Sequence, residues 1–502
     1  MEYIKKLWNE KPLTIIMIAG LLLRILAIIF SKGYGMHDDH FGPSEQPFEI
    51  ILDPSIWENR GNVHGHSIIL PYIHYLVFRF LELFGETDAQ VRAFAMRLIL
   101  GLYSIITVLF GYKIAYETSG KNVARVVGLV LALFWFLPFM SVRSLIELVT
   151  VPPMMVAFYY LIRNNKKSYD PWLVGLFFGL SFCFRYHTSF MLFALMWVWL
   201  FRKEFSTMIK ALGGFLITIF LTQGIVDWVA WGYPLAAPIE YFRFSANDTA
   251  YDIIGPWYKY LVLMIGILIP PMSFALFYGF GRVVKKYYLI AIPALFFLIV
   301  HSITPHKQER YILPMMPIFI TLAIIGWQEF IAKSDFWKKR AGLSKGLWGW
   351  FWIINSILLI IFTFTYSKKT RCESLTYLSD RSDVNGIYMD PGRSGYIQLP
   401  RFYLNKVVPI FQNKAEVTML DVNDSISRAG VGFPNYAIFF GNSPLDSLEK
   451  RTSETEEFFE IKLEKIEEID PSFLDDLLHT LNPRGNKNQT AVIYRIDHSG
   501  NQ

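Results

Sequence analysis

The chain has 502 residues, of which 53% are hydrophobic, 17% are aromatic and only 18% are charged. Soluble domains usually carry about 25% charged residues, and the deficit here falls in long apolar runs that suit lipid-facing helices. The net charge of +6 does not indicate a nucleic-acid partner, because the charges form short clusters between the apolar runs. Composition therefore predicts an integral membrane protein.

The N-terminus contains three lysines among its first eleven residues, followed by an apolar run over 13–30. This run is long for a signal peptide and lacks a good small-residue cleavage site, so we expect a retained transmembrane helix. The two cysteines, Cys183 and Cys372, lie in and just after apolar runs. We expect neither a structural disulfide nor a cysteine metal site, which usually needs paired ligands.

Hydropathy predicts about eleven transmembrane helices, each near the ~20 residues that a bilayer requires. The expected ranges are 13–30, 92–116, 123–140, 144–162, 171–184, 187–201, 208–230, 259–280, 287–303, 311–331 and 346–366. Basic clusters occupy alternate short loops, and the positive-inside bias places those loops in the cytoplasm. The opposite side then receives 31–91, 231–258, 304–310 and the chain after 367.

The apolar stretch 68–84 would reverse this topology if it crossed the membrane. It contains His74, Arg79 and Glu82, which are costly in a lipid-facing span. We therefore interpret it as a helix that lies in the outer membrane interface.

The tail from residue 368 has 16 Lys and Arg against 20 Asp and Glu, whereas the preceding part has 32 and 22. Strand-like segments at 436–440 and 491–496, with a charged helical pattern near 454–480, predict a small soluble α+β domain. The expected organisation is a transmembrane module over 1–367 and a soluble domain over 368–502 on the non-cytoplasmic side.

The first outer loop contains two adjacent carboxylates, Asp38 and Asp39. Two like charges held close and partly desolvated raise the pKa of one of them, which suits a general base. A solvated loop with two ordinary acids is the alternative interpretation.

The same loop also resembles a cluster of ligands for a divalent metal ion, because histidines surround its acids. Neighbouring side chains rarely converge on one ion without a defined turn, so we expect no required metal cofactor. The residues of this alternative are His37, Asp38, Asp39, His40 and Glu45, with nearby His64 and His66.

A basic segment lies between two strong spans on the same side as the acids: it contains His306, Lys307 and Arg310. Point charge from lysine and forked donors from arginine are what phosphate recognition requires. Contact with anionic headgroups is the alternative, but the positive-inside bias makes basic residues unexpected here. Arg185 also faces this side, and we expect it to contact a lipid phosphate. We interpret Arg143 and Glu147 as an intramembrane pair.

The sequence has no Walker A loop, no Rossmann glycine pattern and no zinc-protease helix motif. An ATP-driven pump is therefore not expected, nor is a nucleotide-sugar enzyme with a cytoplasmic catalytic domain. Nucleotide sugars are not available on the outer face of the membrane. An enzyme that acts there can instead use a sugar activated on a lipid carrier.

Three outer segments together resemble glycosyltransferase family 22, the lipid-carrier-dependent mannosyltransferases of glycan and glycosylphosphatidylinositol-anchor assembly. The family's acidic segment resembles residues 37–41 with Glu45, and its Thr-Trp-Glu resembles 56–58. Its His-Lys-Glu-x-Arg-Phe-x-x-Pro segment resembles 306–314. A third segment resembles Asp227, Trp231-Gly232, Asn247 and the aromatic run 255–260.

The resemblance covers roughly residues 13–320, and it departs from the family pattern at Asp39, where the family has Glu, and at Gly42, where it often has Gln. It implies a GT-C fold and an inverting transfer of a hexose, expected to be mannose, from a polyprenyl-phosphate donor to a lipid-linked or glycan acceptor. Asp38 would be the base, with Asp39 second. The donor phosphate would contact His306, Lys307, Arg310 and Arg185. Sugar or acceptor would contact Glu45, Trp57, Glu58, Asn247, Trp257 and Tyr258.

Other functions fit parts of the pattern. A related GT-C transferase could act on protein or lipopolysaccharide, and a transporter or flippase could carry lipid-linked sugars. Transporters often contain inverted repeats, and none stands out in this sequence. A membrane scaffold with a working tail is the third alternative. The compact tail and loops favour a bacterial inner membrane over the endoplasmic reticulum, although sequons at Asn247, Asn423 and Asn488 would permit the latter.

Overall fold

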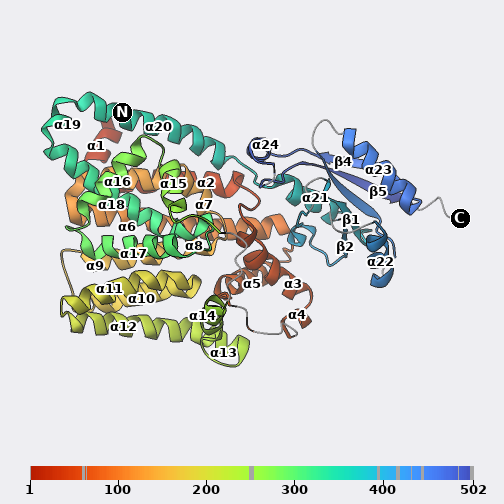
Figure 1. The fold of residues 1–502 in the computed structure, drawn as a ribbon, viewed down its shortest axis with the longest axis horizontal. Coiled ribbons are helices and arrows are strands. Elements are labelled where there is room, and N and C mark those ends of the chain that lie inside the picture. Colours follow the sequence, from red (N-terminus) through yellow and green to blue (C-terminus); the bar gives the residue numbers. More distant parts are fainter. Residues whose placement is uncertain are drawn as a thin grey trace. The chain divides into compact units, whose positions relative to one another are not determined.

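The computed structural model describes residues 2–58, 63, 65–247, 254–392, 396–413, 419–430, 432–441, 446–483 and 485–497. Most of the described chain is helical (Figure 1). The chain forms two compact units. The first, called the helical unit, comprises Met1–Ile28, Gly61–Ile73 and Arg97–Thr363. The second, called the sheet unit, comprises Ile29–Arg60, His74–Met96 and Phe364–Gln502.

The helical unit contains apolar helices joined by short connections. Its α-helices are α1 (Glu2–Glu10), α2 (Pro12–Phe30), α6 (Ala89–Leu133), α7 (Phe136–Ser141), α8 (Ile146–Val149), α9 (Val151–Ile162), α10 (Asp170–Phe184), α11 (Ser189–Phe201), α12 (Phe205–Ile219), α13 (Ile225–Trp231), α14 (Ala236–Asn247), α15 (Lys259–Ile267), α16 (Met272–Val283), α17 (Tyr288–Ile303), α18 (Met316–Lys333), α19 (Asp335–Lys339) and α20 (Ala341–Thr363). Short 3-10 and π segments interrupt them at η3 (Tyr186–Thr188), η4 (Phe220–Gly224) and η5 (Glu309–Met315). The ends of α2 and α6 extend into the sheet unit.

Within the described residues, five helices are long and apolar enough to cross a membrane, or six if the bent pair α15 and α16 forms one span. Four shorter apolar helices accompany them. These features confirm the predicted polytopic membrane protein. Most residues of each predicted span are helical in the structure, although the span 259–280 is broken by a bend of 116° between α15 and α16. The number eleven stays a prediction.

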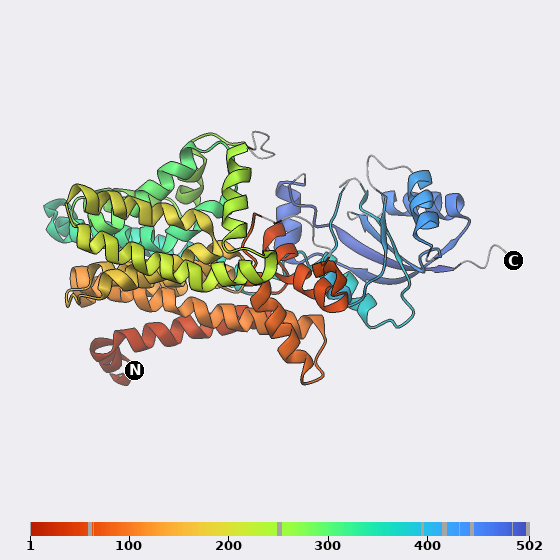
Figure 2. The same cartoon turned by 90° about the horizontal axis from the view of Figure 1, so that it is seen from below.

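Helix α6 covers the predicted span 92–116 and the first part of the span 123–140, and its backbone is not helical at Gly120, between the two. The φ of +78° there is readily adopted only by glycine. Gly111 lies against Leu131 and Gly128 against Tyr112, so the two halves pack antiparallel around Gly120. Figure 2 shows α2, in red, running beside α6, in orange. Arg24 of α2 joins them by donating hydrogen bonds to Ser104 Oγ at 3.0 Å and to the carbonyl of Ala132 at 3.0 Å.

The loops that carry the predicted cytoplasmic charges meet at one end of the helical unit. Hydrogen bonds there join Lys121 to the carbonyl of Asn9, Asn164 to Glu117, and both Ser119 and Lys286 to Glu329. These loops therefore share one end, as the charge pattern predicted. The assignment of that end to the cytoplasm stays a prediction.

Close helix crossings depend on glycines that allow backbones to touch. A Cβ at Gly326 of α18 would lie 1.9 Å from the carbonyl oxygen of Gly279 in α16. A Cβ at Gly175 of α10 would lie 1.9 Å from the carbonyl oxygen of Ala211 in α12. Small residues at such crossings are typical of helices that pack in a membrane.

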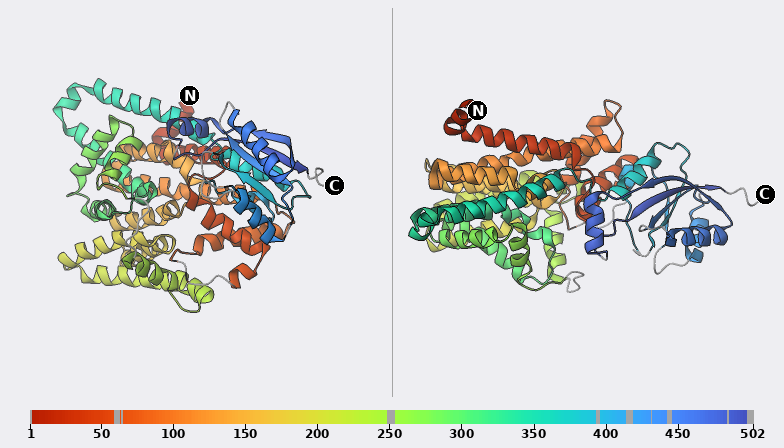
Figure 3. Two further views of the ribbon diagram at one scale, coloured as in Figure 1. Left: turned by 45° about the vertical axis from the view of Figure 1, so that its right-hand side comes forward. Right: turned by 90° about the horizontal axis from the view of Figure 1, so that it is seen from above.

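The sheet unit is built on one twisted five-stranded sheet with the order β2-β1-β3-β5-β4 (Figure 3). Strand β1 is parallel to β2 and β3, whereas β5 is antiparallel to β3 and β4. The strands are β1 (Ile387–Asp390), β2 (Ile410–Gln412), β3 (Tyr436–Gly441), β4 (Lys462–Ile469) and β5 (Thr490–Asp497). Strands β3 and β5 coincide with the two predicted strand-like segments. Every residue of β3 is buried, which explains its continuous apolar sequence.

The segments before and between these strands form helices. They are α3 (Gln46–Leu52), α4 (Ser55–Glu58), α5 (Ile69–Glu82), α21 (Lys369–Ser379), α22 (Met419–Ala429), α23 (Asp446–Phe459) and α24 (Phe473–Leu481), with η1 (His37–Asp39), η2 (Phe41–Glu45) and η7 (Arg401–Leu404). The predicted helical pattern near 454–480 is wrong in its middle, where β4 forms the sheet edge. Its charged residues are typical of a protected edge strand. At 14 residues, α5 is about 21 Å long, shorter than a ~30 Å hydrocarbon core.

Candidate functional site

A buried cluster of two arginines and one glutamate lies in the helical unit. Glu147 Oε1 is 3.4 Å from Arg185 Nη2 and 3.6 Å from Arg310 Nε. The glutamate is 0% exposed and each arginine is 6% exposed. We call these three residues and Tyr311 the arginine cluster. Its three ionised side chains carry one net positive charge, and a buried net charge is costly unless an anion balances it.

Tyr311 lies between the two guanidinium groups. The centroid of its ring is 5.1 Å from the guanidinium carbon of Arg185 and 5.5 Å from that of Arg310. Its hydroxyl forms a hydrogen bond of 2.9 Å with Nε2 of His306. Cation–π contacts of this kind favour arginine over lysine, because a planar guanidinium stacks on an aromatic face.

The arginine cluster forms where helices end. Glu147 lies in the first turn of α8, Arg185 follows the last residue of α10 in extended conformation, and Arg310 lies in η5 before α18. Arg163 pairs with Asp170 at the other end of α10, and Glu329 lies near the other end of α18. At 1.5 Å per residue, these helices separate the two ends by about 20 Å. The cluster is therefore at the end opposite the lysine-rich loops, as predicted for Arg185 and Arg310.

Lys307 has a different environment from its neighbour Arg310. Its buried ammonium donates hydrogen bonds to the carbonyls of His301 at 3.1 Å, Ser302 at 2.7 Å and Thr304. Burial lowers the pKa of Lys307, and the nearby charge of Lys259 adds to this effect. The ammonium thus satisfies backbone carbonyls at the end of α17, which otherwise lack partners. A role of Lys307 in phosphate binding stays a prediction.

The two acids of the first loop differ in their surroundings in the sheet unit. Asp39 is 3% exposed, and its Oδ2 accepts a hydrogen bond of 2.8 Å from the backbone of Gly35. The side chain of Asp38 is 44% exposed, and its Oδ1 is 3.0 Å from Nδ1 of His37. Asp39 therefore shapes the loop, whereas Asp38 is accessible to a hydroxyl group of a substrate.

Residues 398–402 of the C-terminal tail contact the first loop, which carries Asp38 and Asp39. Gln398 Oε1 is 2.7 Å from Nε2 of His37. Glu45 is buried, and its Oε2 lies 3.1 Å from Nε2 of His40 and accepts a hydrogen bond of 3.1 Å from the backbone of Phe402. The described contacts of Glu45 are thus with His40 of the loop and Phe402 of the tail, and its role in sugar binding stays a prediction.

The other predicted sugar or acceptor residues take no part in these contacts. In the sheet unit, α4 carries a half-buried Trp57 and an exposed Glu58. In the helical unit, Trp257 is 65% exposed and Tyr258 is 49% exposed, just before α15. Asn247 ends α14, and its side chain lies outside the described residues. Their roles stay predictions.

The metal-binding alternative gains no geometric support where the structure is described. No group of three or more His, Cys, Asp or Glu side chains that could hold an ion occurs among those residues. His64 lies outside them.

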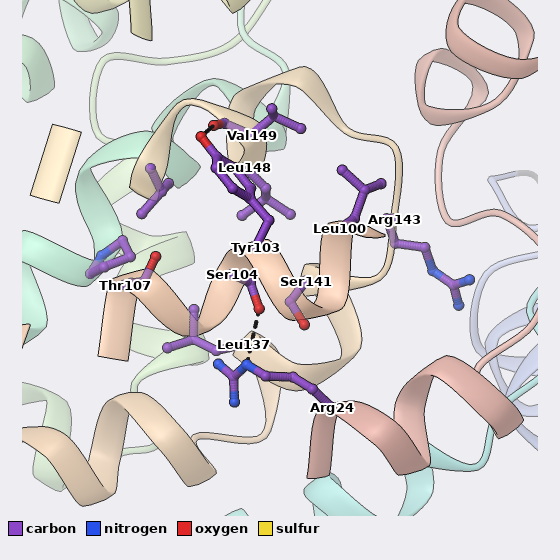
Figure 4. A pocket seen from close by; sticks show the side chains of 12 residues that line it. Arg24, Leu100, Tyr103, Ser104, Thr107, Leu137, Ser141, Arg143, Leu148 and Val149 are labelled. Atoms are coloured by element: carbon purple, nitrogen blue, oxygen red, sulfur yellow. Dashed lines mark hydrogen bonds between the residues drawn. The ribbon is translucent and has the colours of Figure 1, made fainter. Parts of the chain in front are cut away.

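The sequence interpretation did not include Glu147 among the site residues. It interpreted Glu147 as the partner of Arg143 in an intramembrane pair. The structure gives Glu147 two other partners, Arg185 and Arg310. An acid inside a predicted span is a functional candidate by default, and this signal was available in the sequence. Arg143 instead lines a small pocket with Arg24 (Figure 4). Its guanidinium carbon lies 4.7 Å from the centroid of the Phe139 ring. That pocket holds about 30 Å³, far below the ~300 Å³ of the smallest typical ligand sites.

The fold defines the chain as a polytopic membrane protein of the GT-C class. The structure is similar to that of ArnT from Cupriavidus metallidurans in the apo state, with a TM-score of 0.57 at 11% identity over 96% of this chain and 97% of that chain. The ArnT structure bound to undecaprenyl phosphate gives the same values. This likeness confirms the predicted fold.

The model of the Alg9-like mannosyltransferase family matches residues 53–389, and the chain belongs to this family. It is 22% identical to mannosyltransferase APTG1 of Arabidopsis thaliana over 72% of this chain and 70% of that protein. It is 20% identical to GPI alpha-1,2-mannosyltransferase 3 of Homo sapiens over 75% and 67%. The match to GPI mannosyltransferase 3 of Saccharomyces cerevisiae is 26% identical but spans only 38% of this chain and 33% of that protein. The family that the motifs predicted is confirmed.

Proposed function

We propose that the protein transfers mannose from a polyprenyl-phosphate carrier to a lipid-linked or glycan acceptor. Membership of a mannosyltransferase family supports the sugar and the reaction class. The observation that carries the proposal is the arginine cluster, where Arg185 and Arg310 are buried beside the carboxylate of Glu147. Forked guanidinium donors with excess positive charge suit the phosphate of such a donor.

In the proposed step, an acceptor hydroxyl attacks the anomeric carbon and gives its proton to Asp38. The new bond joins the acceptor oxygen to that carbon, with inversion, as the bond between the carbon and the phosphate oxygen breaks. The leaving polyprenyl phosphate keeps the electron pair, and Arg185 and Arg310 stabilise its growing charge. Its exposed carboxylate makes Asp38 a better candidate base than the buried Asp39. The proposed step includes no metal ion.

The site would lie on the non-cytoplasmic face, because the arginine cluster is at the end opposite the lysine-rich loops. The predicted bacterial inner membrane gains no support from the relatives named above, which come from a plant, a mammal and a yeast.

Donor dependence tests the proposal. The full-length protein is reconstituted in vesicles with a lipid extract as acceptor source and either a radiolabelled polyprenyl-phosphate mannose or a nucleotide-linked mannose. We expect label in the lipid-linked or glycan fraction from the polyprenyl donor alone. Transfer from the nucleotide donor alone would contradict the proposal, and so would transfer from neither. An Arg202→Ala variant, altered at the opposite end of the helical unit, is the matched control and should behave like wild type.

A further inference from the structure

We propose that Glu147 sets the charge of the arginine cluster, so that the site holds a singly charged phosphodiester donor and releases the more highly charged phosphomonoester product. This inference rests on the proposed function and names Glu147 as a positioning and specificity-determining residue. It concerns how the site discriminates between its two lipid phosphates.

The first step is the geometry of the carboxylate. Glu147 is fully buried, yet neither of its oxygens accepts a hydrogen bond from any residue that the structure describes. Its two charged partners are at 3.4 Å and 3.6 Å, and they come from segments 38 and 163 residues away in the chain. A purely structural buried acid is normally paired and hydrogen-bonded. Charge alone thus holds this carboxylate between two guanidinium groups.

The second step concerns the neighbouring cations, which have other partners. The ammonium of Lys307 donates to three backbone carbonyls near the end of α17. Lys259 Nζ is 2.7 Å from Glu309 Oε1. Among the described residues, Arg185, Arg310 and Glu147 are thus the charged groups of this part of the site that lie against one another.

The third step compares the two ligands. A polyprenyl-phosphate sugar is a phosphodiester with one negative charge, whereas the polyprenyl phosphate left after transfer is a monoester with about −1.5 to −2 charges at pH 7. Each ligand charge interacts with each site charge by the same Coulomb relation. Removing the charge of Glu147 therefore makes the binding free energy of both ligands more favourable, and the gain for the monoester is about 1.5 to 2 times the gain for the diester. With Glu147 present, the cluster's net charge of +1 matches the donor.

The test compares two affinities in the full-length protein. Binding of a short-chain polyprenyl phosphate and of its methyl ester, which is a phosphodiester, is measured for wild type and for Glu147→Gln. We expect the ratio of monoester to diester affinity to rise in the variant by on the order of tenfold. Product inhibition of sugar transfer should strengthen by a similar factor. A ratio within twofold of wild type would overturn the inference.

Further variants separate charge from packing. Glu147→Asp keeps the charge, so it should preserve the affinity ratio even where its shorter side chain lowers the transfer rate. Gln308→Glu adds a negative charge at a side chain whose Oε1 is 2.7 Å from Arg310 Nε, and it should move the ratio in the opposite direction. This variant keeps the inference testable if Glu147→Gln does not fold, and an unchanged ratio in it would again contradict the charge account. Glu329→Gln, a variant at the opposite end of α18, is the matched control and should keep the wild-type ratio.

The two proposals fail in different ways. If wild type binds both lipids but transfers no sugar from any donor, the proposed function fails while the affinity ratio still tests the role of Glu147. If wild type transfers sugar and the ratio does not respond to Glu147→Gln, only the inference about Glu147 fails.

Discussion

Replacing Arg310 with alanine tests the arginine cluster most directly. Arg310 is 6% exposed, pairs with Glu147 and donates from Nε to Gln308 Oε1 at 2.7 Å. Without Arg310, the charges of Glu147 and Arg185 cancel, and the cluster's net charge falls from one to zero. At an effective dielectric constant near 20, a unit charge about 5 Å from a phosphate contributes roughly 3 kcal/mol. Sugar transfer should therefore fall by about 10²–10³-fold, the range found when one donor to a developing anion is removed.

The assay is the initial rate of transfer from a polyprenyl-phosphate mannose, normalised to inserted, folded protein. Arg310→Lys keeps the charge but loses the forked donor and the planar stacking on Tyr311, so we expect a smaller loss of about tenfold. Arg202→Ala provides the control, because the Arg202 side chain is 52% exposed and pairs with Glu204. An Arg310→Ala protein that retains more than a third of the wild-type rate would refute the assignment of phosphate binding to this cluster.

Three further predictions concern the sheet unit and the helix packing. Gln398→Ala removes the 2.7 Å contact with His37 and should lower the transfer rate about fivefold, with the donor KM unchanged, since one net hydrogen bond contributes about 1 kcal/mol. A raised donor KM with an unchanged maximal rate would contradict that role. Gly326→Ala should cost about 1–3 kcal/mol of stability by overpacking, whereas Gly281→Ala, which meets open space, should melt like wild type. Equal melting temperatures for the two variants would contradict the close crossing of α16 and α18. Burial, with a smaller effect of a neighbouring histidine, lowers the pKa of His74 from 6.5 to about 3. As the pH falls below 6.5, His74 is protonated in the unfolded chain but stays neutral in the folded protein. The free energy of unfolding should therefore fall by about 1.4 kcal/mol per pH unit between pH 6.5 and about pH 3. His74→Gln should remove this part of the slope in pH-dependent melting curves, and an unchanged slope would show that His74 titrates normally.

The sequence predicted the elements of the fold better than their contacts. Apolar runs of helical length identified the spans, and continuous β-branched and aromatic residues identified β3 and β5, because burial imposes those patterns directly. The charged strand β4 was missed, since an edge strand exposed to water carries polar residues and resembles a surface helix. The break in α6 at Gly120 falls between the predicted spans 92–116 and 123–140, although the sequence interpretation did not single out this glycine.

Contacts between distant segments could not be predicted. The pairing of Glu147 with Arg185 and Arg310 depends on three helix ends meeting in space, which hydropathy does not specify. The contact of Gln398 with His37 spans 361 residues. Lys307 donates hydrogen bonds to backbone carbonyls at the end of α17. The sequence shows only a lysine between His306 and Arg310, so it does not reveal these backbone partners. The functional roles of the candidate residues therefore stay predictions, whereas the contacts of Glu147, Gln398 and Lys307 became visible only in the structure.

The most direct test of the central claim is sugar transfer by Asp38→Asn compared with wild type. The substitution keeps the shape of the exposed side chain and removes its capacity to accept a proton. We predict that the rate falls by about 10²–10⁴-fold, while binding of a polyprenyl-phosphate mannose and the melting temperature stay at their wild-type values. Transfer at the wild-type rate in the asparagine variant would contradict the assignment of Asp38 as the base and the mechanism built on it.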